Sequence, residues 1–143
     1  MTSFDTNILF YSLNPESQWH AASVETLEEA LEGDRVVLTD YVLLELYNLL
    51  RNTTVMTKPL SAPAATEIVT QYLNHPNVTR AENAPVMNEV WKIAAKPGFP
   101  RRRIFDLRLG LTLIHHGVTH FATANVKDFK GIGFEKVWNP LLK

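Results

Sequence analysis

The chain opens with Thr2-Ser3-Phe4-Asp5-Thr6-Asn7-Ile8-Leu9-Phe10. This stretch predicts a very short strand that stops at Asp5, followed by hydroxyl and amide residues that can cap a helix beginning near Ile8. A strand that gives way to a helix at a carboxylate places that carboxylate at the carboxyl end of the strand, where open α/β sheets bind ligands. Taken alone, Asp5 is more simply explained as a helix cap, so more distant parts of the chain have to decide its role.

Composition indicates one soluble globular domain over residues 1–143, with 45% hydrophobic and 20% charged residues. No apolar run approaches the roughly 18 residues that a membrane span needs, and the N-terminus lacks the features of a signal peptide. The absence of cysteine excludes a disulfide framework and is compatible with the reducing cytoplasm, where we expect this protein to work away from membranes. A net charge of −1 argues against a protein held on nucleic acid by bulk charge, but leaves room for an enzyme that engages nucleic acid briefly.

Strand and helix patterns alternate along the whole chain. This rhythm predicts an α/β fold with a mainly parallel sheet of about five short strands and helices on both faces. After the opening strand, strands are predicted at 35–39, 78–79, 118–123 and 134–138. Helices are predicted at 8–13, 17–31, 41–51 (capped by Asp40), 61–74, 85–95 and 104–116, the last closed by Gly117.

Glu45 lies in a narrow polar stripe of an otherwise apolar helix, together with Tyr41, Asn48 and Asn52. Such a stripe either faces water or lines a cleft beside the sheet edge, because the preceding strand delivers the helix to that edge. Taken alone, Glu45 is best explained as a solvated residue.

Asp106 shares a helix face with Leu109, Gly110 and Leu113, at the spacing of a core stripe. The opposite, wettable side is predicted to carry Arg108, Thr112 and His115. An isolated ionised carboxylate on an apolar face costs several kcal/mol to desolvate, so it needs a cation, a hydrogen-bond network or a pocket mouth. The alternative is an acid near the helix start that points to water or interacts with the helix N-terminus.

Several familiar sites are absent from the sequence: it contains no dinucleotide-binding glycine loop, no Walker A sequence, no G-x-S-x-G and no H-E-x-x-H. What remains is Asp5, Glu45 and Asp106, with Asn125 and Asp128 following the strand at 118–123. Carboxylates brought together raise one another's pKa, and a hard divalent ion with oxygen ligands, Mg²⁺ or Mn²⁺, relieves that repulsion. Such a site suits phosphodiester hydrolysis with one or two ions.

Arg101, Arg102 and Arg103 stand just before the Asp106 helix. They can hold substrate phosphates, and a basic surface loop with no such role is an equally good explanation.

Four segments resemble the signatures of PIN domains, in the right order and at fitting intervals. They are Phe4-Asp5-Thr6-Asn7-Ile8-Leu9, Leu44-Glu45-Leu46, Ile104-Phe105-Asp106-Leu107 and Thr123-Ala124-Asn125-Val126-Lys127-Asp128-Phe129. Each motif alone is weak, but the ordered set is specific. The similarity is to the VapC-type ribonuclease toxins of toxin–antitoxin pairs.

This resemblance implies a PIN-like three-layer fold, Mg²⁺- or Mn²⁺-dependent endoribonuclease activity, a homodimer, and inhibition by a VapB-like antitoxin that occupies the active-site groove. Asp5, Glu45 and Asp106 match the first three acids of the family, which bind metal directly or through water.

The fourth family position carries Asn125, where many relatives have Asp. As a neutral ligand, Asn weakens binding of a second metal, and Asp128 can compensate, so both residues remain candidates to complete the site. Thr123 resembles the hydroxyl that supports this end of the site, and Thr6 and Asn7 are expected to hold the Asp5 turn in shape.

Two other functions remain open. A phosphatase with Asp5 as covalent nucleophile is disfavoured, because Asn7 stands where a second acid would be expected and no clear phosphate-binding lysine is present. A non-catalytic RNA- or protein-binding module with a vestigial site is conceivable because of Asn125.

Overall fold

Five parallel strands form one sheet in the order β3-β2-β1-β4-β5 in the computed structural model, which describes residues 1–142. The elements in chain order are β1 (Thr2–Phe4), α1 (Thr6–Leu13), α2 (His20–Gly33), β2 (Val36–Thr39), α3 (Asp40–Leu50), α4 (Ala62–Asn74), β3 (Val78–Ala81), α5 (Met87–Ala94), α6 (Arg103–His115), β4 (His120–Ala122), α7 (Val126–Phe129) and β5 (Lys136–Trp138). The predicted α/β fold with a parallel sheet of short strands is confirmed.

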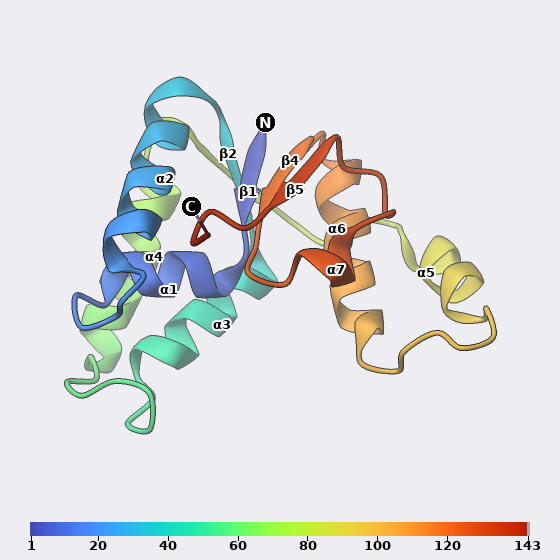
Figure 1. Cartoon of the computed structure of the whole chain (residues 1–143). Coiled ribbons are helices and arrows are strands. Elements are labelled where there is room, and N and C mark those ends of the chain that lie inside the picture. Colours follow the sequence, from blue (N-terminus) through green and yellow to red (C-terminus); the bar gives the residue numbers. More distant parts are fainter. Residues whose placement is uncertain (143) are drawn as a thin grey trace.

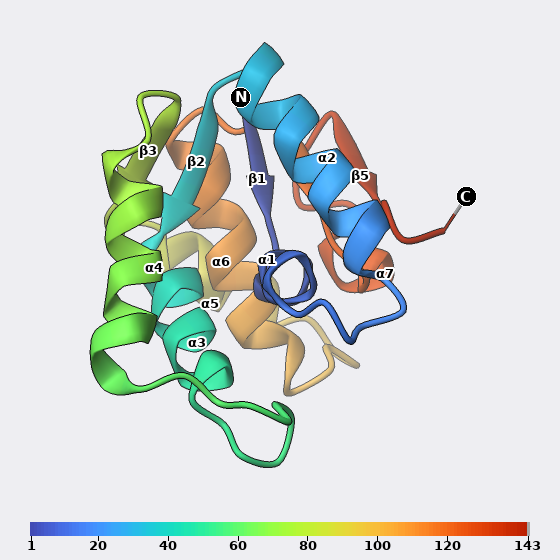
Figure 2. The same cartoon turned by 90° about the vertical axis from the view of Figure 1, so that its left-hand side faces the viewer.

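Helices cover both faces of the sheet, which gives three layers (Figures 1 and 2). In Figure 1, α2 and α4 lie to the left of the strands with α1 and α3 below them, and α5 and α6 lie to the right. None of the helices in residues 1–142 is both long and apolar enough to cross a membrane.

The core lies between the sheet and its helices. Every residue of β1 and β2 is buried, as expected for central strands of a parallel sheet. The largest fully buried side chains include Phe4 on β1 and Phe121 on β4. A smaller cluster joins α5 to α6 through Val90 and Leu107. α6 is therefore packed on two sides, against the main core and against α5.

Several helix starts differ from the sequence prediction: α2 begins at His20 rather than at residue 17, and α5 at Met87 rather than at residue 85. Two further differences concern helix caps. α1 begins at Thr6 rather than near Ile8, because the Asp5 carboxylate accepts a hydrogen bond from the Thr6 N–H and serves as the N-cap. Asp40 does not cap α3: the cap is the Thr39 hydroxyl, which accepts from the Val42 N–H at 3.2 Å.

Two features of the C-terminal half also differ. The sequence pattern predicts Thr112 on the wettable side of its helix, but Thr112 is buried because α6 is covered from two sides. The segment after β4 forms the short helix α7, where no helix was predicted.

α6 ends in a Schellman motif. The Gly117 N–H donates to the Ile114 carbonyl and the Val118 N–H donates to the Leu113 carbonyl, each at 3.0 Å. Gly117 has a φ of 88°, a left-handed conformation that favours glycine. The predicted end of this helix at Gly117 is confirmed, and it turns the chain into β4.

Gly117→Ala is expected to destabilise the protein by about 1–2 kcal/mol, because a left-handed residue with a Cβ is strained. A Cβ at this position would also lie 2.5 Å from the Met1 Cε atom. Gly33→Ala is the matched control, since Gly33 ends α2 without a positive φ and has no atom within 4 Å of a built Cβ. Chemical denaturation should show a loss for Gly117→Ala alone; equal stability of the two variants would contradict this account.

Candidate active site

The carboxyl ends of β1, β2 and β4 meet at one edge of the sheet because the strands are parallel. Asp5 directly follows β1, and its N–H donates to the carbonyl of Ala122, the last residue of β4, at 2.9 Å. Thr123 directly follows β4. Two segments from opposite ends of the chain are thereby joined at the edge where ligands bind in such sheets.

Both oxygens of the Asp5 carboxylate are held by hydrogen bonds. Oδ1 accepts from the Thr6 N–H at 2.9 Å, and Oδ2 accepts from the Thr123 hydroxyl at 2.7 Å. Thr123 is fully buried and its Oγ1 accepts in turn from the Asn125 N–H at 3.0 Å. Asp5 is thus a helix cap and also the centre of a network that reaches the fourth family motif.

Burial raises the pKa of the Asp5 carboxyl above its usual value. The hydrogen bonds from Thr123 and Thr6 oppose this rise, and the charge of Glu45 adds to it. Glu45 therefore lies within electrostatic reach of Asp5, although the two residues come from different helices and strands.

Glu45 is half-buried on α3 and accepts a hydrogen bond from the Tyr41 hydroxyl, one helical turn earlier. This hydrogen bond, with burial and the charges of Glu45, Asp106 and Asp5, raises the pKa of Tyr41 to about 12. The polar stripe of α3 therefore faces the sheet edge at Tyr41 and Glu45. The sequence pattern puts Tyr41 in that stripe without indicating a role for it, although the i to i+4 spacing of Tyr41 and Glu45 is a signal of contact between them.

Asp106 lies in the first turn of α6 and is half-buried. Burial, followed by the charges of Asp5, Asp128 and Glu45, raises the pKa of its carboxyl to about 6, against the opposing charge of Arg103. The acids that the sequence separates widely thus converge on one region.

Asn125 and Asp128 form a direct pair, in which the Asn125 amide Nδ2 donates to Asp128 Oδ2 at 2.6 Å. Asn125 is the N-cap residue of α7, although its side chain makes no capping hydrogen bond there. Because Asp128 lies within electrostatic reach of Asp106, this pair faces the same region from the β4 side.

The three arginines occupy different environments. Arg101 and Arg102 are exposed. Arg103 is half-buried and donates through Nε to the Asp128 carbonyl at 3.1 Å and through Nη2 to the Lys130 carbonyl at 3.2 Å. Arg103 therefore ties the start of α6 to α7.

The two remaining residues of the first motif differ in burial. Thr6 is buried and its Oγ1 has no hydrogen-bond partner within the described chain, whereas Asn7 is exposed on α1.

The chemistry of these donors fits a hard divalent cation, because they are oxygen ligands. Burial raises the pKa values of both Asp5 and Asp106, and the charge of Glu45 adds to the rise in each. In the conformation described for residues 1–142, no three His, Asp or Glu side chains form a ready-made metal cluster. The donor types and the charges of these residues therefore fit a metal ion, although their side chains are not arranged as a complete set of ligands.

Residues 3–135 of this chain match the sequence model of the PIN domain family. Ribonuclease VapC24 of Mycobacterium tuberculosis, in strain CDC 1551 / Oshkosh and in strain ATCC 25618 / H37Rv, is 48% identical over 141 residues, covering 99% of this chain and 97% of that protein. This chain belongs to the PIN-domain family of VapC-type ribonucleases. The resemblance inferred from the four motifs is confirmed.

Solved structures show the same PIN fold at low sequence identity. VapC20 of Mycobacterium tuberculosis, described as a sarcin–ricin loop cleaving toxin, has a TM-score of 0.68 and 16% identity, covering 94% of this chain and 96% of that one. VapBC2 of Rickettsia felis, bound to a DNA fragment from their promoter, has a TM-score of 0.67 and 17% identity, covering 96% and 97%. PIN-domain ribonucleases are generally dependent on divalent metal ions.

Asp106→Asn is expected to raise the melting temperature of the metal-free protein at pH 7. The folded-state pKa of Asp106 is about 6, above the usual value of 3.8 for an aspartate, so the folded protein binds more protons than the unfolded chain between these values. Stability from this group is present at low pH and is lost as the pH rises through about 6.

The measurement is thermal unfolding in a chelator from pH 4 to pH 7, where Asp106→Asn should weaken the pH dependence. Asp40→Asn is the control with the opposite sign, because its hydrogen bond and charge interaction with Arg80 lower the pKa of Asp40. A lower melting temperature for Asp106→Asn at pH 7 would contradict the inferred repulsion.

Proposed function

We propose that this protein is a Mg²⁺- or Mn²⁺-dependent endoribonuclease that hydrolyses RNA phosphodiester bonds, and that it is the toxin of a VapBC-type pair acting in the cytoplasm. The observation that carries the proposal is that Asp5, Glu45 and Asp106 lie within electrostatic reach of one another near the carboxyl edge of the sheet. The charge of Glu45 raises the pKa of Asp5, and the charges of Asp5 and Glu45 raise the pKa of Asp106. A structural role alone gives no reason to gather unneutralised acids at one place.

The residues that would hold the metal are Asp5, Glu45 and Asp106, with Asn125 and Asp128 on the other side. A bound ion supplies positive charge that activates water and neutralises charge on the phosphate oxygens in the transition state. Because no side-chain nucleophile is needed, the contribution of the chain is to position its oxygen ligands and the substrate.

Supporting residues fix the orientation of these ligands. The hydrogen bonds from Thr6 and Thr123 leave the Asp5 carboxylate little freedom to rotate. The Tyr41 hydroxyl orients Glu45 in the same way from within α3. The Asn125 amide, by donating to Asp128, keeps its own carbonyl oxygen and the second Asp128 oxygen available as ligands. Preorganised ligands of this kind lower the cost of assembling the reacting groups.

Arg101 and Arg102 are exposed next to the start of α6 and are proposed to contact RNA phosphates. Arg103 belongs to the same proposed contact, although Nε and Nη2 already donate to carbonyls; its Nη1 makes no hydrogen bond within residues 1–142. Arg103 also places its positive charge near Asp106.

The proposed partners are a VapB-like antitoxin and a second copy of this chain. Support for the antitoxin comes from a protein of similar structure. VapBC2 of Rickettsia felis, whose name joins a VapB to a VapC, was solved bound to a DNA fragment from the promoter of the pair. Support for RNA as substrate comes from Ribonuclease VapC24, which is 48% identical to this chain, and from VapC20, described as cleaving the sarcin–ricin loop.

Asp5→Asn, Glu45→Gln and Asp106→Asn are each expected to reduce RNA cleavage by at least about 100-fold, since each removes a charge that the metal requires, worth several kcal/mol in the transition state. A chelator should abolish cleavage by the wild type, and added Mg²⁺ or Mn²⁺ should restore it. The measurement is cleavage of a fluorescently labelled single-stranded RNA.

Asp34→Asn serves as the control for these variants, because Asp34 lies beside the N-terminal ammonium group at the opposite end of β1 from Asp5. Its cleavage rate should match that of the wild type. Equal cleavage by the wild type and by Asp106→Asn after matched purification would refute the ribonuclease assignment.

Expression of the wild type in a bacterial host is expected to arrest growth, because uncontrolled RNA cleavage stops translation. Asp5→Asn should be tolerated at the same protein level, and co-expression of the small reading frame next to the gene should relieve the arrest by the wild type. Growth curves with matched immunoblots measure both effects. Normal growth of cells that accumulate folded wild type would count against the toxin role while leaving the ribonuclease activity open to the cleavage assay.

A further inference from the structure

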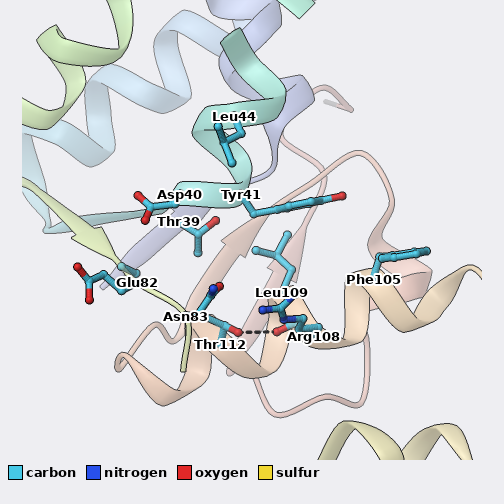
Figure 3. A pocket seen from close by; sticks show the side chains of 11 residues that line it. Thr39, Asp40, Tyr41, Leu44, Glu82, Asn83, Phe105, Arg108, Leu109 and Thr112 are labelled. Atoms are coloured by element: carbon cyan, nitrogen blue, oxygen red, sulfur yellow. Dashed lines mark hydrogen bonds between the residues drawn. The ribbon is translucent and has the colours of Figure 1, made fainter. Parts of the chain in front are cut away.

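A pocket of about 210 Å³ lies between the start of α3, the end of β3 and α6 (Figure 3). The ligand set proposed above does not include its lining. The lining residues are Thr39, Asp40, Tyr41, Leu44, Ala81, Glu82, Asn83, Phe105, Arg108, Leu109 and Thr112.

The pocket shares a wall with the acidic site. The Tyr41 ring lines the pocket, while its hydroxyl donates to Glu45 and is close enough to Asp106 and Asp5 to interact with their charges. On α6, Phe105 lines the pocket and the next residue, Asp106, belongs to the acids. A group bound in this pocket therefore lies directly beside the proposed cleavage site.

Three of the apolar side chains that line the pocket are unusually open to solvent. Tyr41 is 48% exposed, Phe105 65% and Leu44 68%, whereas Phe4 and Phe121 are fully buried. In Figure 3, Tyr41 extends from α3 across Leu109 toward the side on which Phe105 stands on α6. Two accessible ring faces beside one pocket suit a flat ligand, and stacking on aromatic side chains is how proteins hold unpaired bases.

Two polar side chains of the pocket are free to bind a ligand. Within the described chain, neither the Arg108 guanidinium nor the Asn83 side chain has a hydrogen-bond or ion-pair partner. The Asn83 amide offers both a donor and an acceptor to the edge of a base, and Arg108 offers charge-assisted donors to a phosphate.

Acidic residues of the pocket do not cancel this positive charge. Asp40 is already engaged by Arg80, at 2.6 Å from Nε and 2.8 Å from Nη2, and Glu82 lies 3.8 Å from Nη1 of the same arginine. Arg108 is thus left available for an anionic ligand, which favours a nucleotide over an uncharged aromatic compound.

We propose that this pocket binds one unpaired nucleobase of the RNA substrate next to the phosphodiester that is cleaved. The base stacks on Tyr41 and Phe105, its edge is bound by Asn83, and Arg108 contacts the adjoining phosphate. The pocket then selects which phosphodiester enters the acidic site. This inference rests on the proposed ribonuclease function and adds a specificity subsite to it.

The test uses full-length protein carrying Asp5→Asn, so that binding is measured without cleavage. The probe is a fluorescein-labelled single-stranded RNA containing a site that the wild type cleaves, together with a series in which one nucleotide at a time is replaced by an abasic ribose. One abasic position beside the cleaved bond is expected to weaken binding about 10-fold, since stacking of a base on aromatic side chains contributes at this level.

Phe105→Leu and Arg108→Gln, each added to Asp5→Asn, separate the contributions of ring and charge. Phe105→Leu should weaken binding of the intact RNA about 10-fold and remove the difference between intact and abasic RNA at that position. Arg108→Gln should weaken both RNAs alike and reduce the salt dependence of binding. Trp91→Leu is the matched control, because Trp91 is 58% exposed on α5 and does not line the pocket, and it should bind as the parent does.

Tyr41→Phe and Tyr41→Leu then distinguish the two roles of Tyr41. Tyr41→Phe keeps the ring and should preserve discrimination against the abasic RNA while it slows cleavage through Glu45 in the otherwise wild-type protein. Tyr41→Leu should lose both. Circular dichroism of each variant verifies the fold.

Outcomes that overturn the subsite are distinct from those that overturn the enzyme. If the wild type cleaves RNA but Phe105→Leu discriminates intact from abasic RNA as the parent does, the subsite is wrong and the ribonuclease stands. If Phe105→Leu changes the oligomeric state in sedimentation and leaves RNA binding unchanged, the pocket wall is covered by a second copy, which also overturns the proposal. If the wild type cleaves no RNA at all, the proposed function itself fails.

Discussion

The Thr123 hydroxyl and the Thr6 N–H hold the two oxygens of the Asp5 carboxylate at 2.7 Å and 2.9 Å, and the rest of the site is arranged around this acid. The arrangement depends on β1 lying between β2 and β4 in a parallel sheet. In that order the carboxyl end of β1 is flanked by the start of α3 on one side and by Thr123 on the other. A carboxylate at this central position is partly removed from water, so its hydrogen bonds replace solvation that burial takes away.

Convergence of Asp5, Glu45 and Asp106 is expected to destabilise the metal-free fold at neutral pH, and the raised pKa values of Asp5 and Asp106 are the clearest physical sign of a functional site. The pKa of Asp106 is raised to about 6, first by burial and then by its acidic neighbours. The fold withstands this repulsion because the sheet and both helical layers are well packed, with α6 buried against the main core and against α5. A cation that binds here gains from the same repulsion, since it neutralises charges that the chain alone leaves unbalanced.

Tyr41 connects the acidic site to the neighbouring pocket. Its hydroxyl donates a hydrogen bond to Glu45, and its ring forms part of the surface on which the proposed base would stack. A single side chain at the first turn of α3 can thus link recognition of the substrate to the geometry of the ligand set. Selection of one phosphodiester by the neighbouring base is compatible with a chain whose net charge of −1 gives little general attraction for RNA.

Local patterns along the chain determined the alternation of strands and helices, the position of Asp5 after the first strand and the end of α6 at Gly117, because caps, glycines and hydrophobic periodicity act over a few residues. The four ordered motifs also determined the family. Tertiary structure alone decided that Thr123 donates to an acid 118 residues away and that Thr112 is buried. It also decided that Tyr41 of α3 and Phe105 of α6 line the same pocket. These features depend on strand order and on how helices from distant parts of the chain pack together, and neither is encoded in the spacing of neighbouring residues.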